Sequence, residues 1–254
     1  MNMMRIRQVV NLLATHPSLF FSCCYRPHRF MHFSEESMPP DFHIKHTQLC
    51  LKRSINRFQK IYEEDSHFQS KSLLERETAS FPCGRKSWLY ILVRLLKPSS
   101  LIETGVWFGF STSQILQGLS DNQTGKLYSV DAPNTHYDTN LGSHSDFLPN
   151  GMEPGFVIPP KLLKRWELTR GYSKDVLPEL LARVGQVDFF FHDSEHTYAN
   201  MMFEFRCAWK HMTEGAVLCS DDVDWNEAFL DFCKEVGCEG VMAAGIGIVM
   251  KGTH

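Results

Sequence analysis

Short apolar runs alternate with amphipathic segments from about residue 84 to the end of the chain, and this alternation limits the fold more than any other feature. Such runs predict strands, and apolar residues at helical spacing predict helices. Strands are predicted at 99–106, 126–132, 165–171, 187–193, 215–222, 239–245 and 246–252, and helices at 84–98, 111–120, 173–185, 197–212 and 225–237. The alternation predicts an α/β fold, in which a mostly parallel sheet is covered by helices on both faces.

The N-terminal part of the chain differs from this body in charge. Residues 1–60 contain nine Lys or Arg and three Asp or Glu, a balance of +6, whereas residues 61–254 contain seventeen and twenty-six, a balance of −9. We therefore predict a basic helical extension over 1–75 and one domain over 76–254. Asn11, His16 and Pro17 interrupt the first apolar stretch and argue against a signal peptide. A helix packed on the body is favoured, and weak contact with a membrane surface stays open.

Composition argues against several classes of protein. The net charge of −3 disfavours a nucleic-acid-binding protein, whose affinity depends on positive charge. No stretch approaches the roughly 18 uninterrupted apolar residues of a transmembrane helix, so we predict no integral membrane segment. The eight cysteines include no Cys-x-x-Cys pair, which indicates reduced thiols in a cytoplasmic protein. Whether the chain forms a homodimer stays open.

Polar or glycine residues follow each of the five predicted parallel strands. In open α/β sheets, ligands bind outside the carboxyl ends of the strands. The residues at the carboxyl ends of the five strands are, in chain order, Glu103 with Gly105 and Gly109 (first strand), Asp131 (second), Gly171 with Tyr172 and Ser173 (third), Asp193 with His196 (fourth), and Asp221 with Asp222 (fifth). We therefore expect a ligand site at this edge of the sheet.

The turn after the first strand has the form Glu103-x-Gly105-x-x-x-Gly109. Glycines let a ligand approach the backbone closely, and a helix that starts near Ser111, its predicted N-cap, would present N–H groups to an anionic ligand group. The spacing is not Gly-x-Gly-x-x-Gly, which disfavours NAD-dependent oxidoreduction. Asp131, after the second strand, suits a ribose diol, because a carboxylate accepts hydrogen bonds from both hydroxyls. The alternative reading of the glycines is a tight turn without a ligand.

Five segments occur in an order that matches a known family: LIETGVWFGFST, LYSVDAP, RGYSKDVLPELL, VDFFFHDSEHTY and GAVLCSDDVDWN. Together they resemble the class I S-adenosylmethionine-dependent methyltransferases, in particular the small-molecule group described as methyltransferase domain 24, over roughly residues 80–254. The resemblance implies a Rossmann-like, seven-stranded sheet whose last strand is antiparallel. It also implies S-adenosylmethionine as cofactor and a small-molecule methyl acceptor.

The resemblance assigns roles to individual residues. It implies that Glu103, Gly105 and Gly109 surround the methionine end of the cofactor. It places Asp131 on the ribose, and Tyr172 and Ser173 near the adenine. The aromatic residues 107, 108 and 110 could shield the cationic sulfur, and the alternative for each is ordinary packing.

Three carboxylates could supply further chemistry. Asp193, Asp221 and Asp222 follow neighbouring strands and could bind Mg²⁺ or another divalent cation that holds the oxygen of the acceptor. The alternative is that these acids contact the cofactor and cap helices. Similar sequences in the catechol O-methyltransferase branch have Asn where this chain has Asp222. That difference makes the site more negative.

His196 is the predicted general base, because a histidine exchanges protons near neutral pH. Its alternative role is to cap the next helix or to support a neighbouring group, and we assign no catalytic role to His192. The sequence thus predicts a methyltransferase that O-methylates a small hydroxylated molecule. N-methylation stays open, and the alternative function is a non-catalytic cofactor-binding or scaffold protein with the same fold.

Overall fold

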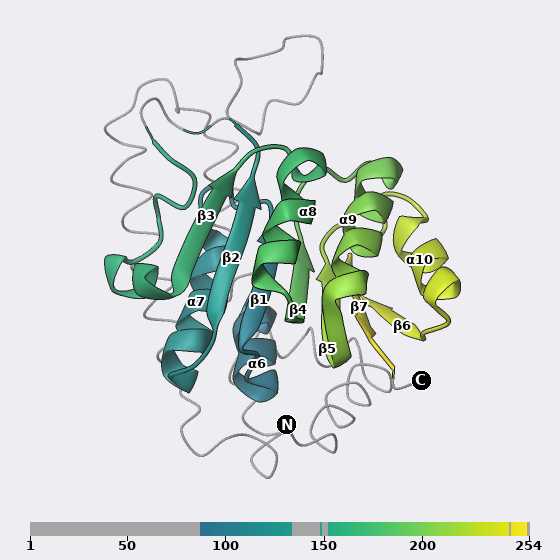
Figure 1. The fold of residues 1–254 in the computed structure, drawn as a ribbon, viewed down its shortest axis with the longest axis horizontal. Helices are drawn as coiled ribbons and strands as arrows, with labels where there is room; N and C mark the ends of the chain where they lie inside the picture. Colours follow the sequence, from purple (N-terminus) through teal and green to yellow (C-terminus); the bar gives the residue numbers. More distant parts are fainter. Residues whose placement is uncertain (1–86, 134–147, 149–151, 244, 253–254) are drawn as a thin grey trace.

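The computed structural model describes residues 87–133, 148, 152–243 and 245–252 (Figure 1). The helical extension predicted over 1–75 lies outside these residues, as does most of the long connection between the second and third strands.

Seven strands form one sheet, in the order β3-β2-β1-β4-β5-β7-β6. The strands are β1 (Ser100–Thr104), β2 (Lys126–Asp131), β3 (Trp166–Arg170), β4 (Val187–His192), β5 (Met212–Ser220), β6 (Gly240–Ala243) and β7 (Ile246–Met250). β7 is antiparallel to β5 and to β6, and the other pairings are parallel. The predicted seven-stranded sheet with its antiparallel last strand is confirmed.

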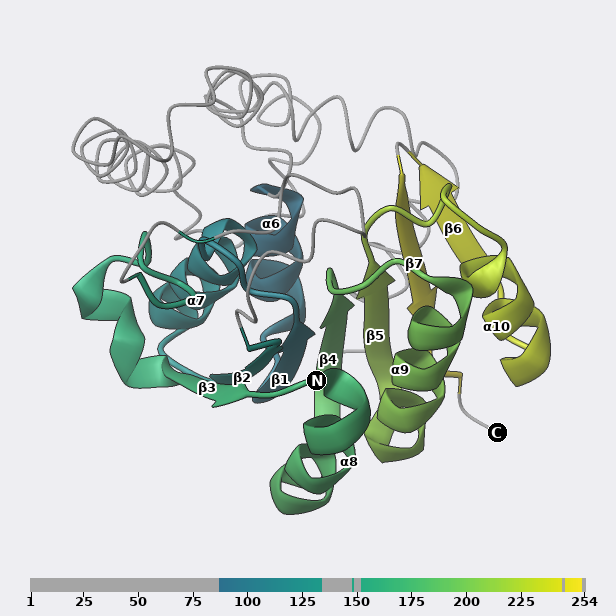
Figure 2. The same ribbon diagram turned by 90° about the horizontal axis from the view of Figure 1, so that it is seen from above.

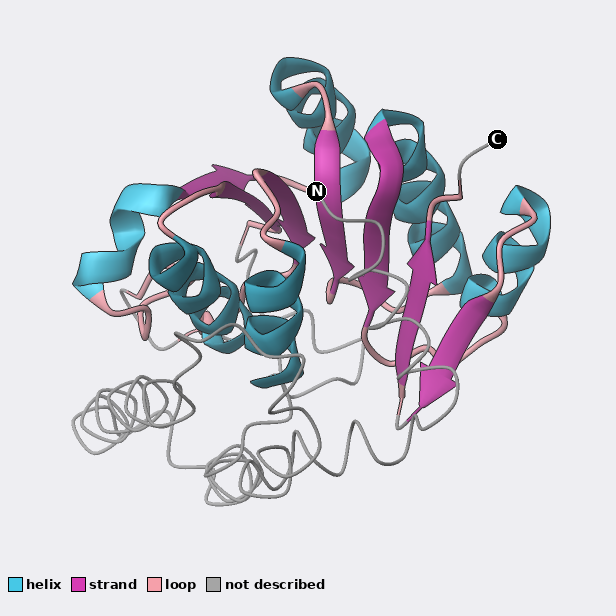
Figure 3. Ribbon diagram, turned by 90° about the horizontal axis from the view of Figure 1, so that it is seen from below, coloured by secondary structure: helices cyan, strands magenta, loops and turns pink. Residues whose placement is uncertain are grey.

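Helices cover both faces of the sheet (Figures 2 and 3). They are α6 (Ser87–Leu96), α7 (Phe110–Asn122), α8 (Ser173–Val184), α9 (Tyr198–His211), α10 (Ala228–Val236) and the 3-10 helix η2 (Pro160–Arg165). The run of phenylalanines in β4 explains this arrangement. Phe189 and Phe191 pack with α6 and α7, whereas Phe190 packs with α8, α9 and α10. Successive side chains of a strand point to opposite faces, so a strand that is apolar throughout requires cover on both sides.

The parallel ladder continues past the carboxyl ends of the strands. The N–H of Gly105 donates to the carbonyl of Val130 at 2.9 Å, and the N–H of Asp193 donates to that of Thr104 at 2.8 Å. In the same way Gly171 is bonded to Asp131, and Asp221 to His192, each at 2.9 Å. These bonds fix the first residue after β1, β3, β4 and β5 at one edge of the sheet, where the sequence predicts the ligand site.

Several predicted element ends differ from the structure, two of them in ways that bear on the site and the sheet. Ser111 is not the N-cap of α7, because the helix begins one residue earlier, after Gly109 in a left-handed conformation. β5 begins at Met212 rather than at residue 215. Within the described ranges, no helix is long and apolar enough to cross a membrane.

Candidate functional site

The turn after β1 lies directly against the end of β4. Gly105 and Gly109 have φ angles of 85° and 93°, in the region that favours glycine. A Cβ atom on Gly105 would lie 2.0 Å from the carbonyl oxygen of Asp193, and one on Gly109 would lie 2.7 Å from the Cα of Gly155. Both positions therefore require glycine, for close packing as well as for backbone conformation.

Glu103 supports this turn from behind. Its side chain is completely buried, and its oxygens accept hydrogen bonds from the hydroxyls of Ser111 (2.8 Å), Thr112 (2.8 Å) and Ser129 (2.7 Å). These bonds join β1 to α7 and β2, and they explain why Ser111 does not cap the helix. Because Glu103 is enclosed in this way, its side chain serves to hold the turn in position. Its predicted contact with the cofactor, and that of Ser111, stay untested.

Asp131 joins the end of β2 to the same turn. Its Oδ2 accepts hydrogen bonds from the backbone N–H groups of Trp107 at 2.7 Å and Val106 at 3.1 Å. Burial raises the pKa of this carboxyl above its ordinary value, and the two N–H donors and the charge of Arg170 partly oppose that rise. The carboxylate is thus fixed beside the glycine turn and lies at the edge where the sequence places a ribose.

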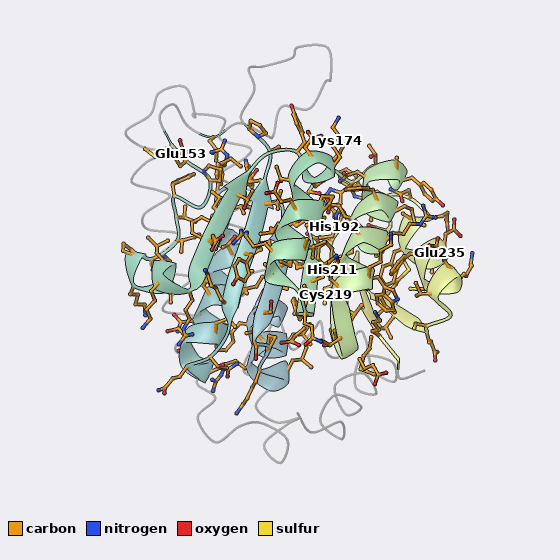
Figure 4. The ribbon with its side chains drawn as sticks, in the orientation of Figure 1. Glu153, Lys174, His192, His211, Cys219 and Glu235 are labelled. Atoms are coloured by element: carbon orange, nitrogen blue, oxygen red, sulfur yellow. The ribbon has the colours of Figure 1, made fainter. Side chains whose placement is uncertain are left out.

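An aromatic cluster closes the outer side of the turn. Phe108 is fully buried, stacks on Trp107 with ring centroids 3.8 Å apart, and meets Phe156 edge to face at 5.1 Å. The segment 152–158 is hydrogen-bonded to the turn, through Gly155 to Trp107 and Val157 to Phe108. The Glu153–Arg170 ion pair joins this segment to the end of β3, and Glu153 marks that edge of the sheet in Figure 4. For Phe108 the packing alternative is therefore the correct one.

A buried polar cluster lies beneath the end of β4, and the sequence reading missed it. His192 and Glu204 are both fully buried, with His192 Nδ1 2.7 Å from Glu204 Oε2. Thr104 donates to the same carboxylate, as do Ser194 at 2.7 Å and Asn200 at 3.2 Å. His192 points toward α9, where its Nδ1 meets Glu204 (Figure 4).

Electrostatics keep Glu204 charged. Burial alone would raise the pKa of this carboxyl, but the neighbouring His192 and the hydrogen-bond donors hold the pKa below its ordinary value. One signal in the sequence could have found Glu204. It is a carboxylate on the face of α9 that carries Met201, Phe205 and Ala208, all of them buried.

His196 lies in the loop between β4 and α9. Its Nε2 is 3.9 Å from Oδ2 of Asp222, and its ring contacts those of His192 and Trp225. Thr197, not His196, caps α9, because its hydroxyl accepts from the N–H of Asn200 at 3.3 Å. The capping alternative for His196 is therefore wrong. Its Nε2 is buried next to Asp222, and both a role as base and a role in supporting a neighbouring group stay predictions.

The three acids predicted to share a metal follow β4 and β5. Asp193 and Asp221 are held by backbone bonds to neighbouring strands, and Asp222 adopts a left-handed conformation with φ of 49°. Among the described residues, no group of three or more His, Cys, Asp or Glu side chains is arranged to hold a metal ion. The metal thus stays a prediction, and the arrangement of these residues does not provide a preformed site for it.

Tyr172 and Ser173 occupy the start of α8. Tyr172 is exposed and precedes the helix, while the Ser173 hydroxyl donates to Oδ1 of Asn200 at 3.1 Å. Both residues lie after β3, at the same edge as Asp131. Their predicted place near an adenine stays a prediction.

The comparisons with known proteins agree with this geometry. Residues 102–223 match a family model described as a methyltransferase domain. The O-methyltransferase TomG from Streptomyces achromogenes, solved in complex with S-adenosylmethionine, is similar in structure with a TM-score of 0.53 and 17% identity. That match covers 88% of this chain and 95% of TomG. An O-methyltransferase from Bacillus cereus, in complex with S-adenosylhomocysteine, has 19% identity, a TM-score of 0.49, and coverage of 71% and 90%.

At these sequence identities the structural similarity shows the fold alone. The evidence for the fold comes from the comparison with TomG. No curated protein matches the sequence. The family model spans the residues from β1 to the turn after β5, which include the glycine turn, Asp131 and the end of β4. Residues 102–223 are thus similar to a methyltransferase domain, and the sheet has the Rossmann-like fold of the methyltransferases.

Proposed function

We propose that this protein binds S-adenosylmethionine at the carboxyl ends of β1 and β2 and transfers its methyl group to a hydroxyl of a small molecule. The observation that carries the proposal is the position of Asp131. Its carboxylate is bonded to two backbone N–H groups of a turn that contains Gly105 and Gly109 in left-handed conformations. The structural likeness to TomG, an O-methyltransferase in complex with S-adenosylmethionine, supports both the cofactor and the acceptor atom.

The residues of this edge have separate binding roles in the proposal. Asp131 accepts hydrogen bonds from the ribose hydroxyls, since an ionised carboxylate is an acceptor with two oxygens. The backbone of the glycine turn approaches the cofactor closely, because no Cβ stands in the way. The first turn of α7 presents N–H groups toward the carboxylate of the methionine portion. Tyr172 and Ser173 lie beside the adenine.

Methyl transfer to oxygen depends on orientation and on removal of a proton. The bound cofactor supplies a methyl group on a positively charged sulfur. Transfer of that methyl group to the acceptor oxygen would leave S-adenosylhomocysteine and release the hydroxyl proton. The hydroxyl proton passes to His196 Nε2 and then to water. Asp222, at 3.9 Å, stabilises the histidine cation that this transfer creates.

The proposal requires no step through a metal. In the proposal, His196 takes the proton and Asp222, 3.9 Å away, stabilises the resulting cation. The described acids form no cluster of three ligands. A cation that binds together with the acceptor would add to this chemistry, and a chelator separates the two cases.

The proposed activity is tested by methyl transfer from S-adenosylmethionine with a labelled methyl group to a panel of small hydroxylated compounds. Transfer is expected for the wild type, and His196→Ala should lower kcat by about 100-fold or more while the affinity for S-adenosylhomocysteine stays unchanged. His211→Ala is the matched control, because His211 lies at the far end of α9 beside Gly185. Full activity of the His196→Ala variant would remove His196 from the mechanism.

A further inference from the structure

Two cysteines stand at the carboxyl end of α10, one on each side of the glycine that ends the helix. Cys233 lies in the last turn and is buried, whereas Cys238 is half-buried and follows Gly237. Glu235, labelled in Figure 4, marks this end of the helix. Gly237 has a φ angle of 64°, and the N–H of Cys238 donates to the carbonyl of Cys233 at 3.1 Å. A helix that ends in this way commonly brings the side chains of the two bonded residues into contact, and here both are thiols.

The contacts of the two sulfur atoms place them over the start of β6. The thiol of Cys238 donates to the carbonyl of Val236 at 3.6 Å, so this side chain turns back over the helix end. A Cβ atom on Gly240, the first residue of β6, would lie 2.5 Å from the Sγ atom of Cys233. Both cysteines pack in the same core cluster. The two side chains therefore meet where the end of α10 packs on the chain that enters β6.

Electrostatics single out the same pair among the described cysteines. Burial raises the pKa of the Cys233 thiol to about 11, and the neighbouring Cys238 thiol adds to the rise. Burial alone raises the pKa of Cys219, and for Cys207 burial acts together with charged side chains. In neither of these cases does a second thiol contribute.

We propose that Cys233 and Cys238 are a modification site, at which a low-molecular-weight disulfide such as glutathione disulfide oxidises the two thiols to a disulfide between them. The inference goes beyond the proposed function and does not depend on it. A disulfide requires two Cα atoms that lie within about 7 Å of each other. The direct backbone hydrogen bond between these two residues, together with the shared packing of their side chains, meets this requirement.

The reaction consists of two thiol–disulfide exchanges. Cys238 reacts first, because it is the more exposed of the two and because the high pKa of Cys233 keeps that thiol protonated. The Cys238 sulfur loses its proton and attacks glutathione disulfide, which forms a mixed disulfide and releases one glutathione. The Cys233 sulfur then loses its proton, attacks the sulfur of Cys238 and releases the second glutathione. The two departing glutathione thiolates take up the two protons, and two electrons pass from the protein thiols to glutathione disulfide.

The disulfide would restrain the edge of the sheet. β6 is last in the strand order and is bonded to β7 alone among the described strands. Peripheral segments with few partners open at a lower free-energy cost than central strands do. Cys238 lies two residues ahead of β6, so a bond to Cys233 fastens the chain that enters this strand to α10. We therefore expect hydrogen exchange of the β6 amides to be slower in the oxidised protein than in the reduced protein.

The test is peptide mapping of the reduced, full-length protein after incubation with glutathione disulfide and blocking of the remaining thiols. Trypsin cleaves after Lys234, so the disulfide joins two separate peptides that a reductant releases. The joined peptides are expected in the wild type and in Cys207→Ala, the matched control, because Cys207 is also half-buried but lies on α9. In Cys233→Ala the reaction should stop with glutathione on Cys238, and in Cys238→Ala the thiol of Cys233 should stay reduced.

The wild-type map decides the inference even where an alanine variant fails to fold. A stable glutathione adduct on Cys238 of the wild type would overturn the proposal, as would a disulfide from either cysteine to another part of the chain. Free thiols at both positions after other cysteines of the folded protein have reacted would also overturn it. Equal hydrogen exchange of β6 in the oxidised and reduced proteins would contradict the restraint on the sheet edge.

Discussion

The Oδ2 atom of Asp131 accepts a hydrogen bond of 2.7 Å from the backbone N–H of Trp107. Trp107 has a φ angle of 49°, which is unusual for a residue other than glycine, and this bond helps to hold it there. The same contact fixes the carboxylate relative to the glycine turn before any ligand arrives. A site whose hydrogen-bond-accepting carboxylate is already in position loses less conformational freedom when the ligand binds.

Cofactor affinity should depend on pH through Asp131. Burial raises the pKa of this carboxyl above its ordinary value. The carboxylate therefore takes up a proton at a higher pH than an exposed aspartate does. The protonated acid accepts fewer hydrogen bonds, and the affinity for S-adenosylhomocysteine should fall as the pH is lowered from 7 through the raised pKa. Calorimetry at a series of pH values checks this. Asp131→Asn should bind weakly with little change over the same range, and an equal decline in both proteins would assign the effect to another group.

The buried Glu204 should be a major contributor to stability. Glu204→Gln replaces a buried carboxylate that accepts hydrogen bonds from Thr104, Ser194 and Asn200. It is expected to lower the free energy of unfolding at pH 7 by about 2 kcal/mol, because an amide cannot satisfy all of these buried donors. Glu235→Gln is the control, since Glu235 pairs with Arg206 on the surface and should change stability by less than about 1 kcal/mol. Urea unfolding measures both. Equal losses of unfolding free energy in the two variants would show that the buried cluster stabilises the protein no more than the surface pair does.

The same carboxylate predicts how stability depends on pH. The pKa of Glu204 is lowered by folding, so its ionised form contributes stability above the ordinary glutamate pKa, and this contribution is lost as the pH falls below that value. Between pH 6 and 3, the wild type should therefore lose more stability than Glu204→Gln. Parallel curves for the two proteins would contradict the lowered pKa.

Two glycines with positive φ angles should differ sharply in their tolerance of alanine. Gly105 and Gly237 have φ angles of 85° and 64°, but a Cβ on Gly237 meets nothing within 4 Å. Gly237 is in the left-handed helical conformation, so Gly237→Ala should cost only the backbone strain, about 1–2 kcal/mol. Gly105→Ala should cost more and abolish cofactor binding, because its Cβ would collide with the carbonyl of Asp193. Thermal unfolding and calorimetry with S-adenosylhomocysteine check this, and similar behaviour of the two variants would refute it.

A chelator tests the metal predicted from Asp193, Asp221 and Asp222. Binding of S-adenosylhomocysteine should be unchanged in excess chelator, since the residues assigned to the cofactor do not require a cation. Loss of methyl transfer under the same conditions would support a metal that binds with the acceptor. Full activity would reject it and leave proton removal to His196.

The strands and the helices on both faces of the sheet followed from the sequence, because apolar runs such as 187–191 have few alternatives to a strand covered on both faces. The start of α7 was not predicted correctly. Ser111 is a suitable N-cap residue by its local sequence, but its hydroxyl is hydrogen-bonded to the buried Glu103, eight residues earlier in the chain. Glu204 was missed for a similar reason. Its partners come from β1, β4 and α9, and spacing along the chain does not reveal contacts between separate elements. Local sequence patterns predicted the helices and strands well. Contacts between buried polar groups could be found only from the three-dimensional structure.

The central claim is that the end of β2 and the glycine turn form the cofactor site, and the most direct test is calorimetry of S-adenosylhomocysteine with the wild type and Asp131→Ala. The wild type should bind, and the variant should bind at least about tenfold more weakly, a loss of about 1.4 kcal/mol. Circular dichroism should show the same fold for both. Equal affinities would remove Asp131 from the site, and absence of binding to the wild type would contradict the assignment of this protein as a functional methyltransferase.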